Sequence, residues 1–115
     1  MPESSKITPF TITTCSRDDA LVLSVTGEVD IATVSALQAA VTEVVSDTSQ
    51  PRVVLDLGAV TFMDSTGVKS VVSMDRQLRA QDRELLVLPG PSPVRRIFEV
   101  MGILDRPGFD GLAWR

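Results

Sequence analysis

The chain has 115 residues, of which 43% are hydrophobic, and its 15 acidic and 11 basic side chains give a formal net charge of −4. This length and composition predict a single domain over residues 1–115 with an apolar core of its own. The chain has no histidine, and Cys15 is its only cysteine. A Ser-His-Asp or Cys-His catalytic arrangement and an internal disulfide are therefore excluded.

These absences indicate a binding protein and not an enzyme. A zinc site would have only carboxylates and one thiol as ligands, so we expect no metal and no other cofactor. The acidic balance opposes direct binding of nucleic acid. No apolar run approaches the ~20 residues of a membrane-spanning helix, and we expect no membrane insertion. A single cysteine is typical of a reducing compartment, so we expect a cytoplasmic protein.

The first half of the chain predicts two strands and a helix. Residues Phe10–Cys15 and Ala20–Thr26 have strand patterns, and the short link at Asp18–Asp19 favours an antiparallel hairpin. Asp30 is a suitable N-cap for a helix over Ile31–Asp47. The apolar stripe of this helix is formed by Ile31, Val34, Leu37, Val41, Val44 and Val45.

The second half alternates between strands and helices. We expect strands at Arg52–Leu57 and Glu84–Leu88, and helices at Thr66–Gln81 and Pro93–Met101. Such alternation implies parallel crossovers. The sequence therefore predicts an α/β fold whose mixed sheet has four to five strands, an antiparallel N-terminal hairpin and three to four helices.

Ser65 is predicted to lie where a buried strand gives way to a helix. The segment Val53–Gly67 indicates a strand, a short connection and then a serine at the start of the helix. Backbone N–H groups without partners at a helix N-terminus can hold a phosphate. Ser65 is therefore the candidate for a switchable site, and the alternative is that this serine is only an N-cap.

Three segments resemble the STAS domain family and its bacterial anti-sigma factor antagonists. Leu23–Asp30, followed by a helix, resembles the opening of a STAS domain. Phe62–Gly67 resembles the phosphorylation motif of the antagonists, and Pro93–Phe98 with Met101–Ile103 resembles the third helix of the family. The segments occur in order and in register, so the resemblance implies a STAS-type fold.

This resemblance implies a function in partner switching. Family members bind an anti-sigma factor, which is a serine kinase of the histidine-kinase-type ATPase fold, and the binding frees a sigma factor. The kinase phosphorylates the serine that matches Ser65, and the phosphorylated form is released. A metal-dependent serine phosphatase then restores the unmodified serine.

The partner surface implied by the resemblance comprises the loop after the second strand and the start of the second helix. Besides Ser65, its residues here are Glu28, Asp30, Asp64, Thr66, Gly67 and Lys69. Simpler interpretations stay open, because Glu28 can be a solvated loop charge and Asp30 a helix cap. Arg95 and Arg96 form either a further partner patch or a solvated helix face.

Two departures from the family and two alternative functions remain. Lys69 stands where the family has a small residue, and the last helix of the relatives is expected to be short or missing before Arg115.

One alternative is a response-regulator receiver domain, because Val53–Asp56 resembles a phosphoacceptor strand and Asp18–Asp19 resembles an acidic pair. The other is a STAS adaptor that is never phosphorylated and acts in a transporter or stress-signalling complex.

Overall fold

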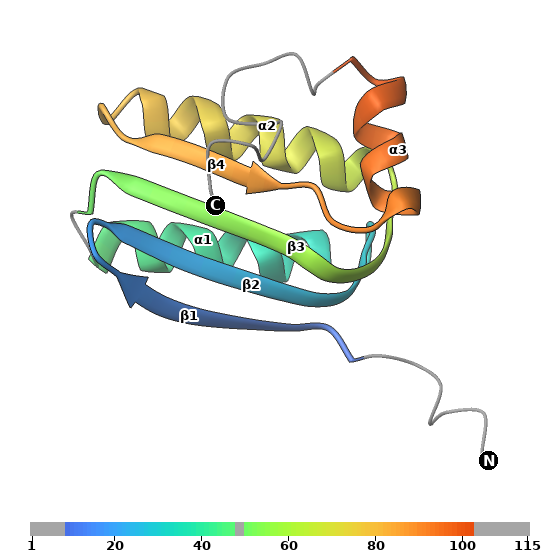
Figure 1. Cartoon of the computed structure of the whole chain (residues 1–115), viewed down its shortest axis with the longest axis horizontal. Coiled ribbons are helices and arrows are strands. Elements are labelled where there is room, and N and C mark those ends of the chain that lie inside the picture. Colours follow the sequence, from blue (N-terminus) through green and yellow to red (C-terminus); the bar gives the residue numbers. More distant parts are fainter. Residues whose placement is uncertain (1–8, 48–49, 103–115) are drawn as a thin grey trace.

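Four strands form one mixed sheet in the computed structural model, which describes residues 9–47 and 50–102 (Figure 1). The strands are β1 (Thr11–Arg17), β2 (Ala20–Val29), β3 (Arg52–Met63) and β4 (Glu84–Leu88), and they lie in the order β1-β2-β3-β4. β1 pairs with β2 in an antiparallel hairpin, whereas β2–β3 and β3–β4 are parallel. The predicted α/β class and the N-terminal hairpin are therefore confirmed.

Within the described ranges three helices pack against this sheet, namely α1 (Val34–Asp47), α2 (Ser65–Arg79) and α3 (Ser92–Val100). α1 and α2 lie behind the sheet in Figure 1, and α3 stands at the end of the sheet where β3 and β4 finish. The expectation of a short or missing last helix falls on residues 103–115, which lie outside the described residues.

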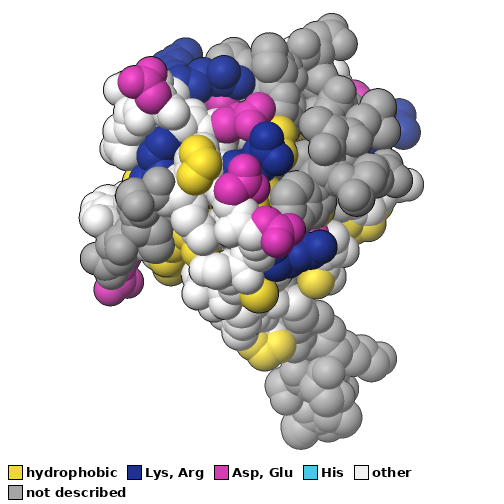
Figure 2. All heavy atoms as spheres, turned by 60° about the vertical axis from the view of Figure 1, so that its left-hand side comes forward, with side chains coloured by type: hydrophobic (Ala, Val, Ile, Leu, Met, Phe, Trp, Pro, Cys, Tyr) yellow, Lys and Arg dark blue, Asp and Glu magenta, His cyan; other side chains and the backbone are white. Residues whose placement is uncertain are grey.

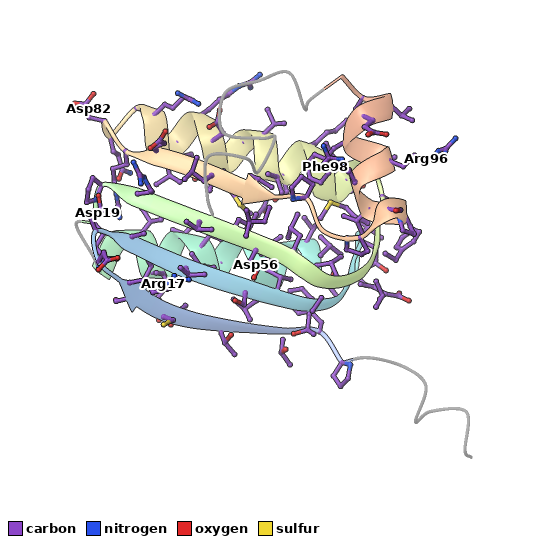
Figure 3. All side chains as sticks on the ribbon, in the orientation of Figure 1. Arg17, Asp19, Asp56, Asp82, Arg96 and Phe98 are labelled. Atoms are coloured by element: carbon purple, nitrogen blue, oxygen red, sulfur yellow. The ribbon has the colours of Figure 1, made fainter. Side chains whose placement is uncertain are left out.

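One core joins the sheet to all three helices. Leu55 in the centre of β3, Leu37 in α1, Leu78 in α2 and Phe98 in α3 are all buried in it (Phe98 is labelled in Figure 3). Burying a side chain of this kind contributes about 1.5–3 kcal/mol, so each helix is fixed to the sheet mainly by its apolar face.

The helix α1 begins later than the sequence predicts. Its first residue is Val34 and not Ile31, and the side chain of Ile31 is 79% exposed instead of belonging to the buried stripe. The reason is local, because Asp30 and Thr33 hold the intervening residues in a separate turn. The helices α2 and α3 begin one residue before the predicted starts.

The parallel strands β2 and β3 continue further than the sequence predicts. The residues from Gly58 onward were expected to be a connection, but they belong to β3 and pair with β2 after register shifts between Ser24 and Thr26 and between Gly27 and Glu28. As a result, Glu28 lies opposite Phe62 and Val29 lies opposite Met63. This extension brings the loop after β2 beside the start of α2.

Gly90 shapes the turn that leads from β4 into α3. Its φ of +86° is in the left-handed region, and a Cβ atom at this position would collide with the backbone carbonyl of Leu57. Only glycine accommodates both conditions without strain. The turn therefore passes close to β3 and places α3 at the same end of the sheet as Ser65.

Candidate functional site

Three connections meet at the carboxyl ends of the parallel strands, which is the usual place for a site on an open α/β sheet. They are the β2–α1, β3–α2 and β4–α3 connections. The backbone N–H of Asp64 donates to the carbonyl oxygen of Val29 over 3.3 Å, so the first two connections are joined directly. The predicted partner residues of both connections are therefore brought to one edge of the sheet.

Asp64 is the N-cap of α2. Its backbone is extended, with φ −106°, and its Oδ1 accepts a hydrogen bond from the N–H of Gly67 at 3.1 Å. Its carbonyl oxygen also accepts the first helical hydrogen bond, from the N–H of Val68 at 3.2 Å. The alternative that Ser65 serves only as the cap of this helix is therefore wrong.

Ser65 is the first residue of α2 and is exposed. The prediction that it lies at the helix N-terminus within reach of solvent is confirmed. Within the described part of the chain its hydroxyl has no hydrogen-bond partner, and the neighbouring hydroxyl of Thr66 is on a half-buried residue. The N–H groups of Ser65 and Thr66 have no intrahelical acceptor, because they precede the first turn. An anion attached to Ser65 would meet these groups and the positive end of the helix dipole.

Gly67 has a packing role in this connection. It is buried, and a Cβ atom there would lie 2.8 Å from Cγ of Met63 and 2.9 Å from Cγ1 of Val29. Any other residue would push α2 away from the ends of β2 and β3. The close approach that Gly67 permits keeps Ser65 in a fixed position relative to the loop after β2.

Lys69 lies one helical turn after Ser65 and is exposed. Residues four apart on a helix are neighbours on its surface, so the ammonium group of Lys69 can reach a group attached to Ser65. No carboxylate in the described residues forms an ion pair with Lys69. The charge of Lys69 is therefore available to a phosphate on Ser65 or to a partner.

Asp30 is occupied by its own loop. Its Oδ1 accepts hydrogen bonds from the N–H groups of Ala32 at 2.9 Å and of Thr33 at 3.3 Å. The hydroxyl of Thr33 in turn donates to the carbonyl oxygen of Glu28 at 2.8 Å. Asp30 thus caps the turn before α1 and not α1 itself, whereas the side chain of Glu28 is exposed at the same edge. Their contact with a partner remains a prediction.

A groove beside this site was not predicted from the sequence. It is lined by Phe62, Met63, Pro93, Arg96, Ile97 and Val100, from the end of β3 and from α3. The two residues from β3 are at least 30 positions away from those of α3 in the chain, so no local pattern could join the two sides of the groove. Arg95 forms an ion pair with Glu99 at 3.6 Å, while Arg96 extends from α3 into solvent at the groove (Figure 3).

The acidic residues of the receiver interpretation do not come together. Asp56 lies within β3, where its Oδ1 accepts a hydrogen bond from the N–H of Gly58 at 2.9 Å. Asp18–Asp19 forms the hairpin turn at the other end of the sheet, and Asp19 and Asp56 are well separated in Figure 3. Over residues 9–47 and 50–102 no three acidic, cysteine or histidine side chains are grouped to hold a metal. The receiver interpretation is therefore wrong.

Charges on the side away from Ser65 are mixed. Figure 2 brings forward the end of the sheet with the β1–β2 turn, and acidic and basic side chains alternate there without a region of one sign. Ion pairs such as Arg79–Asp75 at 3.0 Å and Arg52–Glu84 at 3.2 Å join opposite charges. Among the described residues visible on this side, no surface of a single charge is formed.

Comparison with known proteins gives a consistent family. The family model described as "Mlab, STAS domain" matches residues 12–107. The anti-sigma-F factor antagonist RsfB of Mycobacterium tuberculosis (strain CDC 1551 / Oshkosh) is 34% identical over 94 residues, which are 82% of this chain and 75% of the relative.

Solved structures agree with this relationship. An anti-sigma factor antagonist from Mycobacterium paratuberculosis superposes with a TM-score of 0.76 at 32% identity, covering 89% of each chain. The Bacillus cell fate determinant SpoIIAA in its phosphorylated form superposes with a TM-score of 0.61 at 26% identity, covering 83% of this chain and 85% of that one. The fold and the curated relatives therefore point to the same class of regulatory protein.

Proposed function

Since this chain belongs to the STAS domain family of anti-sigma factor antagonists, we propose that it binds an anti-sigma factor and that phosphorylation of Ser65 ends the binding. The anti-sigma factor is proposed to be a serine kinase of the histidine-kinase-type ATPase fold, which holds a sigma factor until this chain displaces it. A metal-dependent serine phosphatase is proposed to reverse the modification. With such partners, the protein is proposed to act in the cytoplasm.

One observation carries the proposal, namely that Asp64 caps α2, so that the exposed Ser65 is not used as the cap. A kinase needs a hydroxyl that is accessible and whose modification leaves the fold intact. Ser65 meets both conditions, because Asp64 and not Ser65 makes the capping bond to Gly67. A relative of known structure was studied in a phosphorylated form, which supports phosphorylation as part of the mechanism.

The charge of a phosphate explains how one modification can act as a switch. Phosphorylation adds about −1.5 to −2 charges at neutral pH. Within the domain this charge is favoured by the N-terminus of α2. At an interface the phosphate lies beside Asp64 and near the loop of Glu28. There it faces an acidic or closely packed partner, and like charges that meet across an interface cost several kcal/mol. The phosphorylated domain therefore stays folded but loses its partner.

We propose that the chain acts by binding and does not itself catalyse a reaction. Its curated relatives are named as regulatory antagonists. The described helices include none that is long and apolar enough to cross a membrane. The proposed role requires neither a metal nor an organic cofactor in this chain.

Incubation with the anti-sigma factor kinase and ATP tests the proposal. Phosphopeptide mapping should find the phosphate on Ser65, because Ser65 is exposed and Thr66 is half-buried. A phosphate on Thr66 would contradict the assignment of the site. An unmodified chain that still binds the kinase would favour the adaptor alternative.

A further inference from the structure

We infer that the groove between β3 and α3 receives an apolar side chain and an adjacent carboxylate of the anti-sigma factor. The name "Phe62 groove" is used below for the surface lined by Phe62, Met63, Pro93, Arg96, Ile97 and Val100. This inference rests on the function proposed above and adds a second contact region to the one around Ser65.

Two of the large exposed apolar side chains in the described part of the chain lie at the groove. In the described ranges three large apolar residues are exposed, namely Ile31 at 79%, Phe62 at 47% and Val100 at 74%. Phe62 and Val100 line the same groove. An isolated exposed apolar residue is normal, but two around one groove that half-buried Ile97 also lines form a surface that gains from being covered.

The helix α3 has a second apolar face that the core uses only in part, through half-buried Ile97. Val94 and Phe98 are buried against the sheet and make up its core face. Pro93, Ile97 and Val100 are spaced by four and three residues, so they form another face, directed at Phe62. Pro93 and Val100 on this second face are exposed, and a helix with such a second apolar face is suited to bind a further protein segment.

Charge selects the kind of side chain that fits. Among residues 9–47 and 50–102, Arg96 is the one charged residue that lines the Phe62 groove, and no other residue in these ranges forms an ion pair with it. Its neighbour Arg95 lies outside the groove and is already paired with Glu99. A guanidinium group favours a carboxylate, with which it can form two parallel hydrogen bonds. The groove therefore fits an apolar anchor next to an acidic residue.

The groove is continuous with the phosphorylation site. Phe62 and Met63 end β3, and Asp64 and Ser65 follow them directly in the chain. One partner surface can therefore cover the groove and the start of α2 together. The two regions differ in charge, because Asp64 lies beside Ser65 and Arg96 beside the groove, and this difference fixes the orientation of the partner.

Titration calorimetry of the full chain with its anti-sigma factor kinase tests the inference. Phe62→Ala and Arg96→Glu should each weaken binding roughly tenfold, and Val100→Ala roughly threefold, as central interface residues do. Arg96→Lys should retain part of the affinity. The matched control is Arg76→Glu, which makes the same charge change on an exposed residue of α2 outside the groove and should bind within about twofold of the parent.

Three results are distinguishable. If all groove variants bind within about twofold of the parent while melting like it, the groove is not a contact and the inference is overturned. If the parent itself does not bind the kinase, the proposed function fails. If sedimentation shows that the chain alone is a dimer that Arg96→Glu dissociates, the groove holds a second copy and our choice of occupant is wrong. Val100→Ala and Arg96→Glu keep the test valid if Phe62→Ala unfolds.

Discussion

The Oδ1 atom of Asp64 accepts a hydrogen bond from the backbone N–H of Gly67 at 3.1 Å, and this contact separates the folding role from the proposed switching role at the start of α2. Asp64 provides a hydrogen-bond acceptor for an N–H group at the start of α2, and Gly67 lets the helix approach β2 and β3 closely. Ser65, which lies between them, has an exposed hydroxyl that neither function needs. Stability and switching should therefore respond to different substitutions within four consecutive residues.

The first prediction concerns the cap. Asp64→Ala should lower the free energy of unfolding by about 0.5–2 kcal/mol, because the N–H of Gly67 loses its acceptor. Ser65→Ala is the matched control and should change this free energy by less, since Ser65 makes no capping bond. Urea denaturation of both variants measures the difference. A larger loss in Ser65→Ala than in Asp64→Ala would contradict the assignment of the cap.

The second prediction concerns the close approach at Gly67. Gly67→Ala should destabilise the protein by about 1–3 kcal/mol through overpacking, which outweighs the helix propensity of alanine. The added Cβ would meet Met63 and Val29, both of which are buried. Gly58→Ala is the control, because its Cβ would meet only Oδ1 of Asp56 at the end of a side chain. Thermal denaturation should show a clearly larger loss for Gly67→Ala.

The third prediction concerns Lys69. In the phosphorylated protein the second pKa of the Ser65 phosphate should be lower in the parent than in Lys69→Ala, because a cation one turn away favours the dianion. Asp64 acts on the phosphate equally in both proteins. A ³¹P NMR titration gives the pKa directly, with Arg76→Ala as a control further along α2. Equal midpoints for the parent and Lys69→Ala would show that Lys69 does not face the phosphate.

The fourth prediction is that a negative charge at position 65 leaves the fold intact. Ser65→Asp places a carboxylate in the first turn of α2, where the helix dipole stabilises an anion by about 0.3–1 kcal/mol and offsets repulsion from Asp64. Its melting temperature should therefore stay close to that of the parent in calorimetry. A clear loss of stability would mean that position 65 does not tolerate charge, and binding data on this variant could then not be assigned to the interface.

The sequence was sufficient for those features that depend on local patterns. The bounds of β4 at Glu84–Leu88 agree with the prediction, because an apolar run is enclosed by a turn on each side. The helix α2 begins at Ser65, one residue before the predicted start, because this segment combines a strand end with a good capping residue. Only the identity of the cap differs, since Asp64 and Ser65 are both suitable and the backbone of Asp64 is the extended one.

Features that depend on tertiary contacts were not predictable in the same way. Gly58 looks like the end of a strand, but pairing with the longer β2 continues β3 to Met63. Ile31 fits a helical stripe by spacing, but the hydrogen bonds of Asp30 hold it in an exposed turn. The Phe62 groove exists only because the turn at Gly90 directs α3 to the end of β3.

The central claim is that phosphorylation of Ser65 controls binding without unfolding the domain. The most direct measurement is a titration of the anti-sigma factor kinase with the unmodified chain and with the chain phosphorylated on Ser65, together with calorimetric melting of both. We predict similar melting temperatures and binding of the phosphorylated form that is at least roughly tenfold weaker, equivalent to about 1.4 kcal/mol. Equal affinities, or weaker binding that arises only because the phosphorylated chain has unfolded, would contradict the account.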